Sequence, residues 1–406
     1  MNVGIWPWGI RDADKIPDAA GTYLNLIHFG DTVLKRALLI GAMAESLIEF
    51  RADLIRDLVA RGYKVTGAAA APLTPEVLDQ IHALGADFVP LPLHRTGINP
   101  LRDMVTMLAI RKLLRRIRPH VLICYTIKPV VYGGLAVRTA GVRHLRFVPM
   151  ITGLGFAFHG GSAKRNALKG LASQLYRQAM VPVHNAIFQN PDDRALFVKK
   201  GLVPMKKTRI VNGSGVNLTQ FARVPLPPGP EVTFLLAARL LKAKGIREYV
   251  EAATQVKQKY PNARFIIIGY KDSSPDAIPE SMIESWATSD VISYEGGVKD
   301  VRPFVTRASV CVLPSYSEGL PRTVLEALAM GRPVITTDVP GCRETVTQDV
   351  NGCLIPARNV PALAAAMERY LTEPGLMERH GEASYQLALE KFDVRKVNVD
   401  ILAAIE

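Results

Sequence analysis

The chain has 406 residues, 48% of them hydrophobic, which is enough for two domains of roughly 200 residues with separate cores. Its net charge of +13 is uneven, because residues 1–222 hold 29 Lys and Arg against 14 Asp and Glu, while residues 223–406 hold 21 against 23. A basic first half favours an anionic membrane surface or a polyanionic substrate, and no helix-turn-helix, zinc-finger or RNA-recognition motif supports nucleic acid. No apolar run approaches the roughly 18 residues of a membrane-spanning helix, and the first 20 residues are too charged for a secretory signal. We therefore expect a cytoplasmic protein.

The first half of the chain alternates between strand-like and helix-like patterns. Residues 1–35 lack periodicity and form an N-terminal extension of unknown role. Residues 36–222 are predicted to form one domain, with strands at 36–40, 63–67, 87–90, 121–125, 145–149 and 186–189 and helices at 48–61, 75–84, 100–116, 131–139, 163–179 and 191–199. This alternation predicts a doubly wound parallel sheet.

A proline-rich linker at 218–232 separates this domain from a second one with the same pattern. Residues 223–390 are predicted to contain strands at 232–237, 264–268, 291–294, 308–313 and 334–337 and helices at 245–260, 281–288, 298–306, 321–330, 361–373 and 376–391. A last helix at 391–406 is expected to pack back on the first domain. The predicted fold class is α/β, with two Rossmann-like, doubly wound domains facing across a cleft.

The most informative segment is the Pro-Ser-Tyr-Ser-Glu-Gly-Leu-Pro run that begins at Pro314. It follows a buried strand, turns at Gly319 and starts a helix near Pro321, so free backbone N–H groups and the positive end of a helix dipole meet a ligand there. Glu318 and Glu326 bracket the turn, and carboxylates at such a place suit sugar hydroxyls better than phosphate. Two solvated glutamates on an ordinary strand–helix unit are the alternative.

This segment resembles the Glu-x7-Glu signature of the retaining glycosyltransferases of family 4, which have the GT-B fold. The resemblance implies that Glu318 faces the donor sugar, that Glu326 binds the nucleotide ribose, and that Gly319, Leu320 and Pro321 also contact the donor.

A second motif, Ala237 to Gly245, lies after the first strand of the second domain and opens its first helix. It is similar to the Arg…Lys-Gly element with which family 4 enzymes hold the donor diphosphate, and this implies roles for Arg239 and Lys244. An arginine fork and a lysine point charge suit a diphosphate, so no divalent metal or other cofactor is expected. The resemblance also places the base pocket near Gly296, where a plain turn is the alternative.

In the first domain, a glycine-lined turn, an aromatic wall and a basic helix suit a lipid-linked diphosphate acceptor. The candidate contacts are Gly153, Gly155, Phe156, Lys164 and Arg165. Many family 4 enzymes have a histidine in the loop after the fourth strand, but this chain has Tyr125-Thr126-Ile127-Lys128-Pro129. Lys128 is the candidate to support the leaving or the acceptor diphosphate, and a solvated lysine is the alternative.

Four further segments are similar to a family 4 subgroup, namely 93–100, 126–129, 188–193 and 212–217. The subgroup includes the N-acetylgalactosaminyltransferase of bacterial N-glycan assembly and related capsule and O-antigen enzymes. The resemblance implies transfer of a hexose or N-acetylhexosamine from a UDP-sugar to an undecaprenyl-diphosphate-linked sugar, with retention. The alternatives are a UDP-sugar epimerase of the same fold and an inactive lipid-surface subunit. The basic amphipathic helix 101–118, which includes Arg111, Lys112, Arg115 and Arg116, predicts peripheral binding to the inner membrane. A sheet-covering helix with a solvated basic face is the alternative.

Overall fold

The computed structural model describes residues 35–406 except 72, 95–98 and 154–162, and it leaves out the side chains of 163–169, 171 and 287. The predicted extension therefore lies outside the described residues, apart from its last position. Within the described residues, no helix is both long enough and apolar enough to cross a bilayer.

The first domain contains a parallel sheet with the strand order β3-β2-β1-β4-β5-β6-β7. Its strands are β1 (Lys35–Ile40), β2 (Tyr63–Ala70), β3 (Ala86–Leu91), β4 (Val121–Tyr125), β5 (Arg146–Ile151), β6 (Ala186–Phe188) and β7 (Thr208–Ile210). The buried positions of β1 and β4 are almost all apolar, as expected for parallel strands covered on both faces. Strand β7 was not predicted, because its sequence Thr-Arg-Ile mixes polar and apolar residues and lacks the apolar run of a buried strand.

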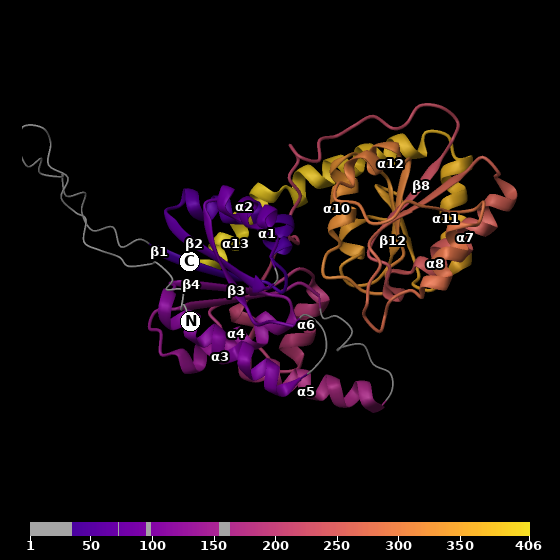
Figure 1. Ribbon diagram of the computed structural model, residues 1–406. Coiled ribbons are helices and arrows are strands. Elements are labelled where there is room, and N and C mark those ends of the chain that lie inside the picture. Colours follow the sequence, from indigo (N-terminus) through magenta and orange to yellow (C-terminus); the bar gives the residue numbers. More distant parts are fainter. Residues whose placement is uncertain (1–34, 72, 95–98, 154–162) are drawn as a thin grey trace, which may run out of the picture. The chain divides into compact units, whose positions relative to one another are not determined.

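Helices cover both faces of this sheet (Figure 1). The helices α1 (Glu45–Ala60), α2 (Pro75–Ala83) and α13 (Val394–Ile405) share one hydrophobic core with it. The other core includes α3 (Pro100–Ile117), α4 (Ile127–Ala140), α5 (Ala163–Ala179) and α6 (Pro191–Lys199), and a short 3₁₀-helix, η2 (Met205–Lys207), precedes β7.

The starts of α3 and α6 follow directly from the sequence Asn-Pro. Asn99 and Asn190 each accept a hydrogen bond at the side-chain oxygen from the backbone N–H three residues later, at 3.2 and 2.8 Å. The following proline has a φ angle suited to the first helical turn and no N–H to leave unpaired. These two caps therefore fix where both helices begin.

The second domain is built on a parallel sheet with the order β10-β9-β8-β11-β12-β13. Its strands are β8 (Thr233–Ala237), β9 (Arg264–Ile268), β10 (Ser293–Tyr294), β11 (Val310–Leu313), β12 (Val334–Thr337) and β13 (Gly352–Ile355). The two doubly wound sheets confirm the predicted fold class. Strand β13 was not predicted, because its glycine and cysteine give a weak strand pattern over only four residues.

Two helical layers again enclose this sheet. One core includes α7 (Ile246–Lys259), α8 (Glu280–Ala287) and α11 (Val360–Thr372), and the other includes α9 (Arg302–Arg307), α10 (Arg322–Ala329) and a π-helical turn, η5 (Ala388–Phe392). The predicted helix 376–391 is shorter in the structure, where α12 (Leu376–Leu387) passes into η5. A 3₁₀-helix, η4 (Arg343–Thr345), lies between β12 and β13.

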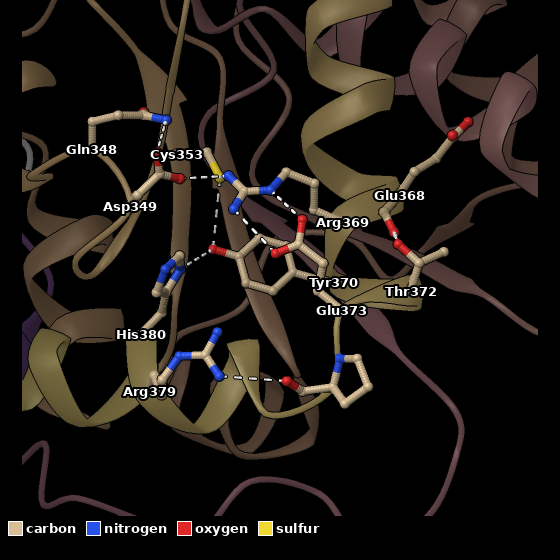
Figure 2. Close-up of polar contacts among 11 residues, drawn as sticks. Gln348, Asp349, Cys353, Glu368, Arg369, Tyr370, Thr372, Glu373, Arg379 and His380 are labelled. Carbon is tan, nitrogen blue, oxygen red and sulfur yellow. Dashed lines mark hydrogen bonds and ion pairs between the residues drawn. The ribbon is translucent and has the colours of Figure 1, made fainter.

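A polar cluster joins β13, α11 and α12 on the side of the second domain shown in Figure 2. The Tyr370 hydroxyl lies 2.8 Å from Nδ1 of His380, and Arg369 donates to both Asp349 and Glu373. Burial lowers the pKa of His380, and burial also raises the pKa of the Cys353 thiol. A neutral imidazole and a protonated thiol fit a structural role, which is to hold α12 against the sheet.

Candidate functional site

The two motifs of the second domain leave adjacent strands at the same end of the sheet. Strands β8 and β11 are neighbours, and the helices that follow them, α7 and α10, belong to different cores. This is the topological switch point of the sheet, where open α/β folds bind their ligands beyond the carboxyl ends of the strands.

The loop after β8 is shaped by a 3₁₀-helix, η3 (Lys242–Lys244), and by Gly245, which has a φ of 70°. A Cβ atom at Gly245 would lie 2.1 Å from the Pro314 carbonyl oxygen, so only glycine permits this approach. The Tyr316 N–H donates to the Ala243 carbonyl at 2.9 Å. The two loops are therefore held together by backbone contacts.

Lys244 and Glu318, one from each motif, form an ion pair between Nζ and Oε1. The Ser315 hydroxyl donates to the same Oε1 at 2.7 Å, and the Lys244 and Glu318 side chains are only 20% and 12% exposed. Hydrogen bonds to a charged, largely buried carboxylate are stronger than neutral ones. The sequence placed Glu318 and Lys244 in separate motifs, and the structure brings them together.

Arg239 lies in the same loop as Lys244 but has a different partner. Its Nη1 donates to Oδ2 of Asp272, in the loop after β9, at 2.8 Å, and its side chain is 49% exposed. Asp272 holds one edge of the guanidinium, so the exposed remainder can meet an anion. Asp272 lies outside the two motifs that the sequence singled out in this domain.

Glu326 is buried in the second turn of α10, next to Arg322. Nε of Arg322 donates to its Oε1 at 2.7 Å, and Glu326 is 5% exposed. Burial raises the pKa of Glu326 more than the Arg322 charge lowers it. Arg322 also lies over the ring of Phe50, with 5.1 Å from the guanidinium carbon to the ring centre.

The Glu318–Gly319 turn also contacts the first domain. The Asn190 amide donates to the Gly319 carbonyl at 2.9 Å, and a Cβ at Gly319 would lie 2.2 Å from the Thr152 carbonyl oxygen. Burial raises the pKa of Asp193, which accepts a hydrogen bond from Asn190, to about 6. Asn190 and Asp193 belong to a segment that the sequence singled out only for its subgroup resemblance, so their contact with this turn was missed.

The remaining predicted residues are placed as follows. Gly296 has a φ of 78°, and its carbonyl accepts from the Gly269 N–H at 2.8 Å. Gly153, just after β5, has a φ of 114° and lies against Gly319, since a Cβ there would come 3.0 Å from the Gly319 nitrogen. The candidates outside the described residues or side chains are Gly155, Phe156, Lys164 and Arg165.

Lys128 does not join the Lys244–Glu318 pair. It lies in the first turn of α4, and its Nζ contacts Oδ1 of Asp103 on α3 at 3.0 Å, with the two side chains 17% and 10% exposed. The solvated alternative is therefore wrong for Lys128, because it is a largely buried partner of a carboxylate. Its predicted role at a diphosphate stays a prediction.

Residues 49–214 match the family model described as "Glycosyl transferase 4-like domain", and residues 231–373 match the model "Glycosyl transferases group 1". The two motifs at the switch point lie within the second match. The chain is a glycosyltransferase, with a 4-like first domain and a group 1 second domain. A relative from Campylobacter jejuni, N,N'-diacetylbacillosaminyl-diphospho-undecaprenol alpha-1,3-N-acetylgalactosaminyltransferase, is 25% identical over 85% of this chain and 92% of its own length.

A second relative of this glycosyltransferase, from Escherichia coli, is UDP-Gal:alpha-D-GlcNAc-diphosphoundecaprenol alpha-1,3-galactosyltransferase, which is 27% identical over 74% of this chain and 77% of its own length. Among solved structures, Anabaena HepE in complex with UDP-glucose has a TM-score of 0.72 at 15% identity and covers 91% of this chain and 99% of its own. Sucrose-phosphate synthase from Thermosynechococcus elongatus also has a TM-score of 0.72, at 18% identity, over 91% of this chain and 98% of its own. At these identities the structural likeness shows the fold alone, which is GT-B.

Proposed function

We propose that this glycosyltransferase moves a hexose or N-acetylhexosamine from a UDP-sugar to an undecaprenyl-diphosphate-linked sugar, with retention of the anomeric configuration. The observation that carries the proposal is the Lys244–Glu318 pair at the switch point of the second sheet. The names of the Campylobacter and Escherichia relatives, which act on undecaprenyl-linked sugars, support this acceptor class.

The donor would lie against the loops after β8 and β11. Arg239, with its exposed guanidinium, and Lys244 would meet the diphosphate, Glu318 would accept from a hydroxyl of the sugar, and Glu326 would accept from the ribose. As the bond to the sugar breaks, negative charge grows on the diphosphate, and fixed cations there stabilise the transition state more than the ground state. These cations take the place that a divalent metal has in other transferases, so activity should survive a chelator.

Retention would follow a front-face route. Double displacement needs two carboxyl groups about 5–5.5 Å apart around the sugar. Of the two candidate carboxylates, Glu326 is bound to Arg322 and Glu318 to Lys244 and Ser315. Neither is a free nucleophile. The leaving diphosphate would instead help to deprotonate the acceptor hydroxyl.

The test uses purified protein with a set of UDP-sugars, with and without a polyprenyl-diphosphate-linked sugar. Transfer to the lipid-linked sugar that persists in EDTA is expected, and the variant Glu318→Gln should lose most of its turnover. Isomerisation of a UDP-sugar without any acceptor would instead support the epimerase alternative. Absence of both reactions with every UDP-sugar, while UDP still binds, would support the inactive lipid-surface subunit.

We further propose that α3 binds the cytoplasmic face of the inner membrane. On one side of this helix, Leu101, Met104, Val105 and Leu108 are 81%, 54%, 53% and 46% exposed. These residues have the i, i+3, i+4, i+7 spacing of a single helix face, and exposed Lys112 continues the same stripe. Exposed apolar side chains beside cations suit the interface of an anionic bilayer.

Two arginines of α3 have hydrogen-bond partners within the first domain. Nε of Arg111 and of Arg115 donate to the carbonyls of Thr139 and Ala140 at the end of α4, at 3.0 and 3.1 Å. These two arginines therefore cap a helix, and the cations that we propose to face the membrane are Lys112 and Arg116.

Flotation with phosphatidylglycerol vesicles tests this face. Binding should weaken with added salt, and it should fall in the variant Leu101→Ser/Leu108→Ser and in Lys112→Gln/Arg116→Gln. The matched control is Arg264→Gln/Lys271→Gln, which removes two exposed cations from the second domain. Equal flotation of all four proteins would show that α3 is not the membrane face.

A further inference from the structure

A basic pocket opens at the amino-terminal edge of the first sheet, opposite the edge that carries Thr152 and Gly153. Its volume is about 770 Å³, and its charged or titratable lining residues are Arg36, Arg115, Arg118, His120, Arg143 and His144. A second hollow of about 420 Å³ shares His120 and His144 with it and adds Lys35 and Arg146. No carboxylate lines either hollow among the residues that the structure describes.

The arginines of the basic pocket have no acidic partner within the described part of the chain. Nε of Arg36 donates to the Arg118 carbonyl and Nε of Arg115 to the Ala140 carbonyl, each at 3.1 Å. These bonds use one edge of each guanidinium to cap α3 and α4. Capping alone explains Arg36 and Arg115, but it does not explain Arg118 and Arg143, which also face the pocket.

Two of the residues that line the pocket have left-handed backbone conformations, and one of them, Arg118, is the C-cap of α3. Arg118 and His144 have φ angles of 48° and 60°, in the left-handed region that is unfavourable for residues with a Cβ. Gly141, which lines the same pocket, also has a positive φ, of 68°. At that position the chain has the residue that this conformation favours. The chain keeps Arg118 and His144 at conformations where glycine is more favourable.

The charged side chains that line the pocket are all arginines, and two histidines lie among them. Nδ1 of His120 accepts from the Arg36 N–H at 3.0 Å, which leaves Nε2 as the imidazole donor. Burial lowers the pKa of His120, and the charges of Arg36 and Lys35 lower it further. Cations that lower the pKa of a neighbouring imidazole also attract an anion to the same place.

We propose that the basic pocket binds a multiply charged phosphate anion. Guanidinium forks recognise phosphate oxygens in a bidentate manner, and several of them around one hollow suit an anion with more than one negative charge. Such an anion is either a soluble diphosphate or a lipid headgroup with two phosphates, and both present the same oxygens. The site lies at the opposite sheet edge from Thr152 and Gly153 and is independent of the proposed transferase function.

The first experiment is a calorimetric titration of the full chain with inorganic pyrophosphate. The variant Arg115→Gln/Arg143→Gln should bind at least tenfold more weakly than the wild type. Arg118→Asn is the decisive variant, because asparagine tolerates a positive φ and removes the charge. It should keep or raise the unfolding temperature of the free protein and still weaken pyrophosphate binding.

Two controls separate this site from the donor loops and from general charge effects. The variant Arg239→Ala/Lys244→Ala should keep the pyrophosphate binding of the basic pocket, and Arg264→Gln in the second domain should bind as the wild type does. Pyrophosphate binding to Arg239→Ala/Lys244→Ala that is not weakened by adding Arg115→Gln/Arg143→Gln, or that is absent from Arg239→Ala/Lys244→Ala, would overturn the proposal.

The source of the anion is identified with vesicles that contain cardiolipin, a lipid with two phosphates in its headgroup. If pyrophosphate competes with vesicle binding and the pocket variants lose both, the ligand is a lipid headgroup. If the pocket variants bind vesicles normally but lose pyrophosphate, the ligand is a soluble phosphate compound.

Discussion

Lys244 and Glu318 stabilise each other, because the charge of each offsets the desolvation cost of burying the other. A largely buried carboxylate that loses its cation keeps its desolvation penalty and loses its strongest hydrogen bond. Truncating either side chain to alanine therefore also disturbs the other residue. An isosteric substitution is needed beside the truncation to separate the two roles.

Lys244→Ala should lower kcat/KM for the donor by about ten- to a hundredfold, which corresponds to about 1.5–3 kcal/mol for one charge-assisted contact. Arg239→Ala should have an effect of the same size, because its exposed guanidinium meets the same anion. Steady-state kinetics with varied UDP-sugar measure this. Lys242→Ala, in the same loop, is the control and should behave like the wild type. A folded double variant with normal donor kinetics would rule out the diphosphate role.

Glu326→Gln should weaken the binding of UDP alone, by roughly tenfold or more, because an amide accepts a weaker hydrogen bond from the ribose than a carboxylate does. Glu318→Gln should leave UDP affinity nearly intact and lower turnover instead, since its proposed contact is with the sugar. Calorimetry with UDP beside turnover measurements separates the two residues. The exposed pair Lys259–Glu368 offers Glu368→Gln as a control. Unchanged UDP affinity in Glu326→Gln would exclude the ribose contact.

At the scale of elements, the first turn of α6 links a titrating side chain to the Glu318–Gly319 turn. Asn190 caps the helix, donates to Asp193 and donates to the Gly319 carbonyl. Asp193 is 5% exposed, and burial raises its pKa to about 6. The folded state thus favours the neutral form of Asp193. The contribution of this neutral form to the free energy of unfolding is lost as the pH rises through about 6.

Asp193→Asn should therefore raise the free energy of unfolding at pH 7.5, by up to about 3 kcal/mol for a shift of this size at about 1.4 kcal/mol per pH unit. The gain should shrink as the pH falls from 7 toward 4, because Asp193 then becomes neutral in the wild type as well. Urea unfolding at pH 7.5 and 4.5 measures both values, and Asp79→Asn, at an exposed carboxylate of α2, is the control. A gain that is larger at pH 4.5 than at pH 7.5 would contradict the assignment.

The sequence predicted most elements because their patterns are local. Buried parallel strands appear as short apolar runs, and the Asn-Pro and glycine signals mark helix ends within a few residues. It missed β7 and β13, which have three and four residues, because neighbouring strands hold them in the sheet and their own side chains show little pattern.

At the site, the motifs predicted which residues matter, but not which of them meet. The Arg239–Asp272 contact joins loops 33 positions apart, and the Asn190–Gly319 bond joins positions 129 apart. Arg332 shows the same limit. It looks like an ordinary surface residue in the sequence, yet it is fully buried and donates to the Val224 and Pro225 carbonyls of the linker.

At the scale of the whole molecule, the C-terminal helix of the chain completes one hydrophobic core of the first domain. Helix α13 places Val397, Ile401 and Leu402 in the core shared by α1, α2 and the first sheet. Asn185 and Arg146 donate to the carbonyls of Ala404 and Ile405, at 3.0 and 3.1 Å. The first domain is thus not contiguous in sequence, and its stability depends on residues that follow the whole second domain.

Ile401→Ala should destabilise the first domain by about 2–5 kcal/mol, because a fully buried side chain leaves a cavity that the surroundings fill only in part. Hydrogen exchange should rise in peptides from β1, β2 and α1. Peptides from β8, β11 and α10 should exchange as before, since the donor loops belong to other cores, and UDP affinity should be unchanged. Val399→Ala on the same helix, where Val399 is 58% exposed, is the matched control. Faster exchange in α10 than in α1 would mean that α13 supports the second domain instead.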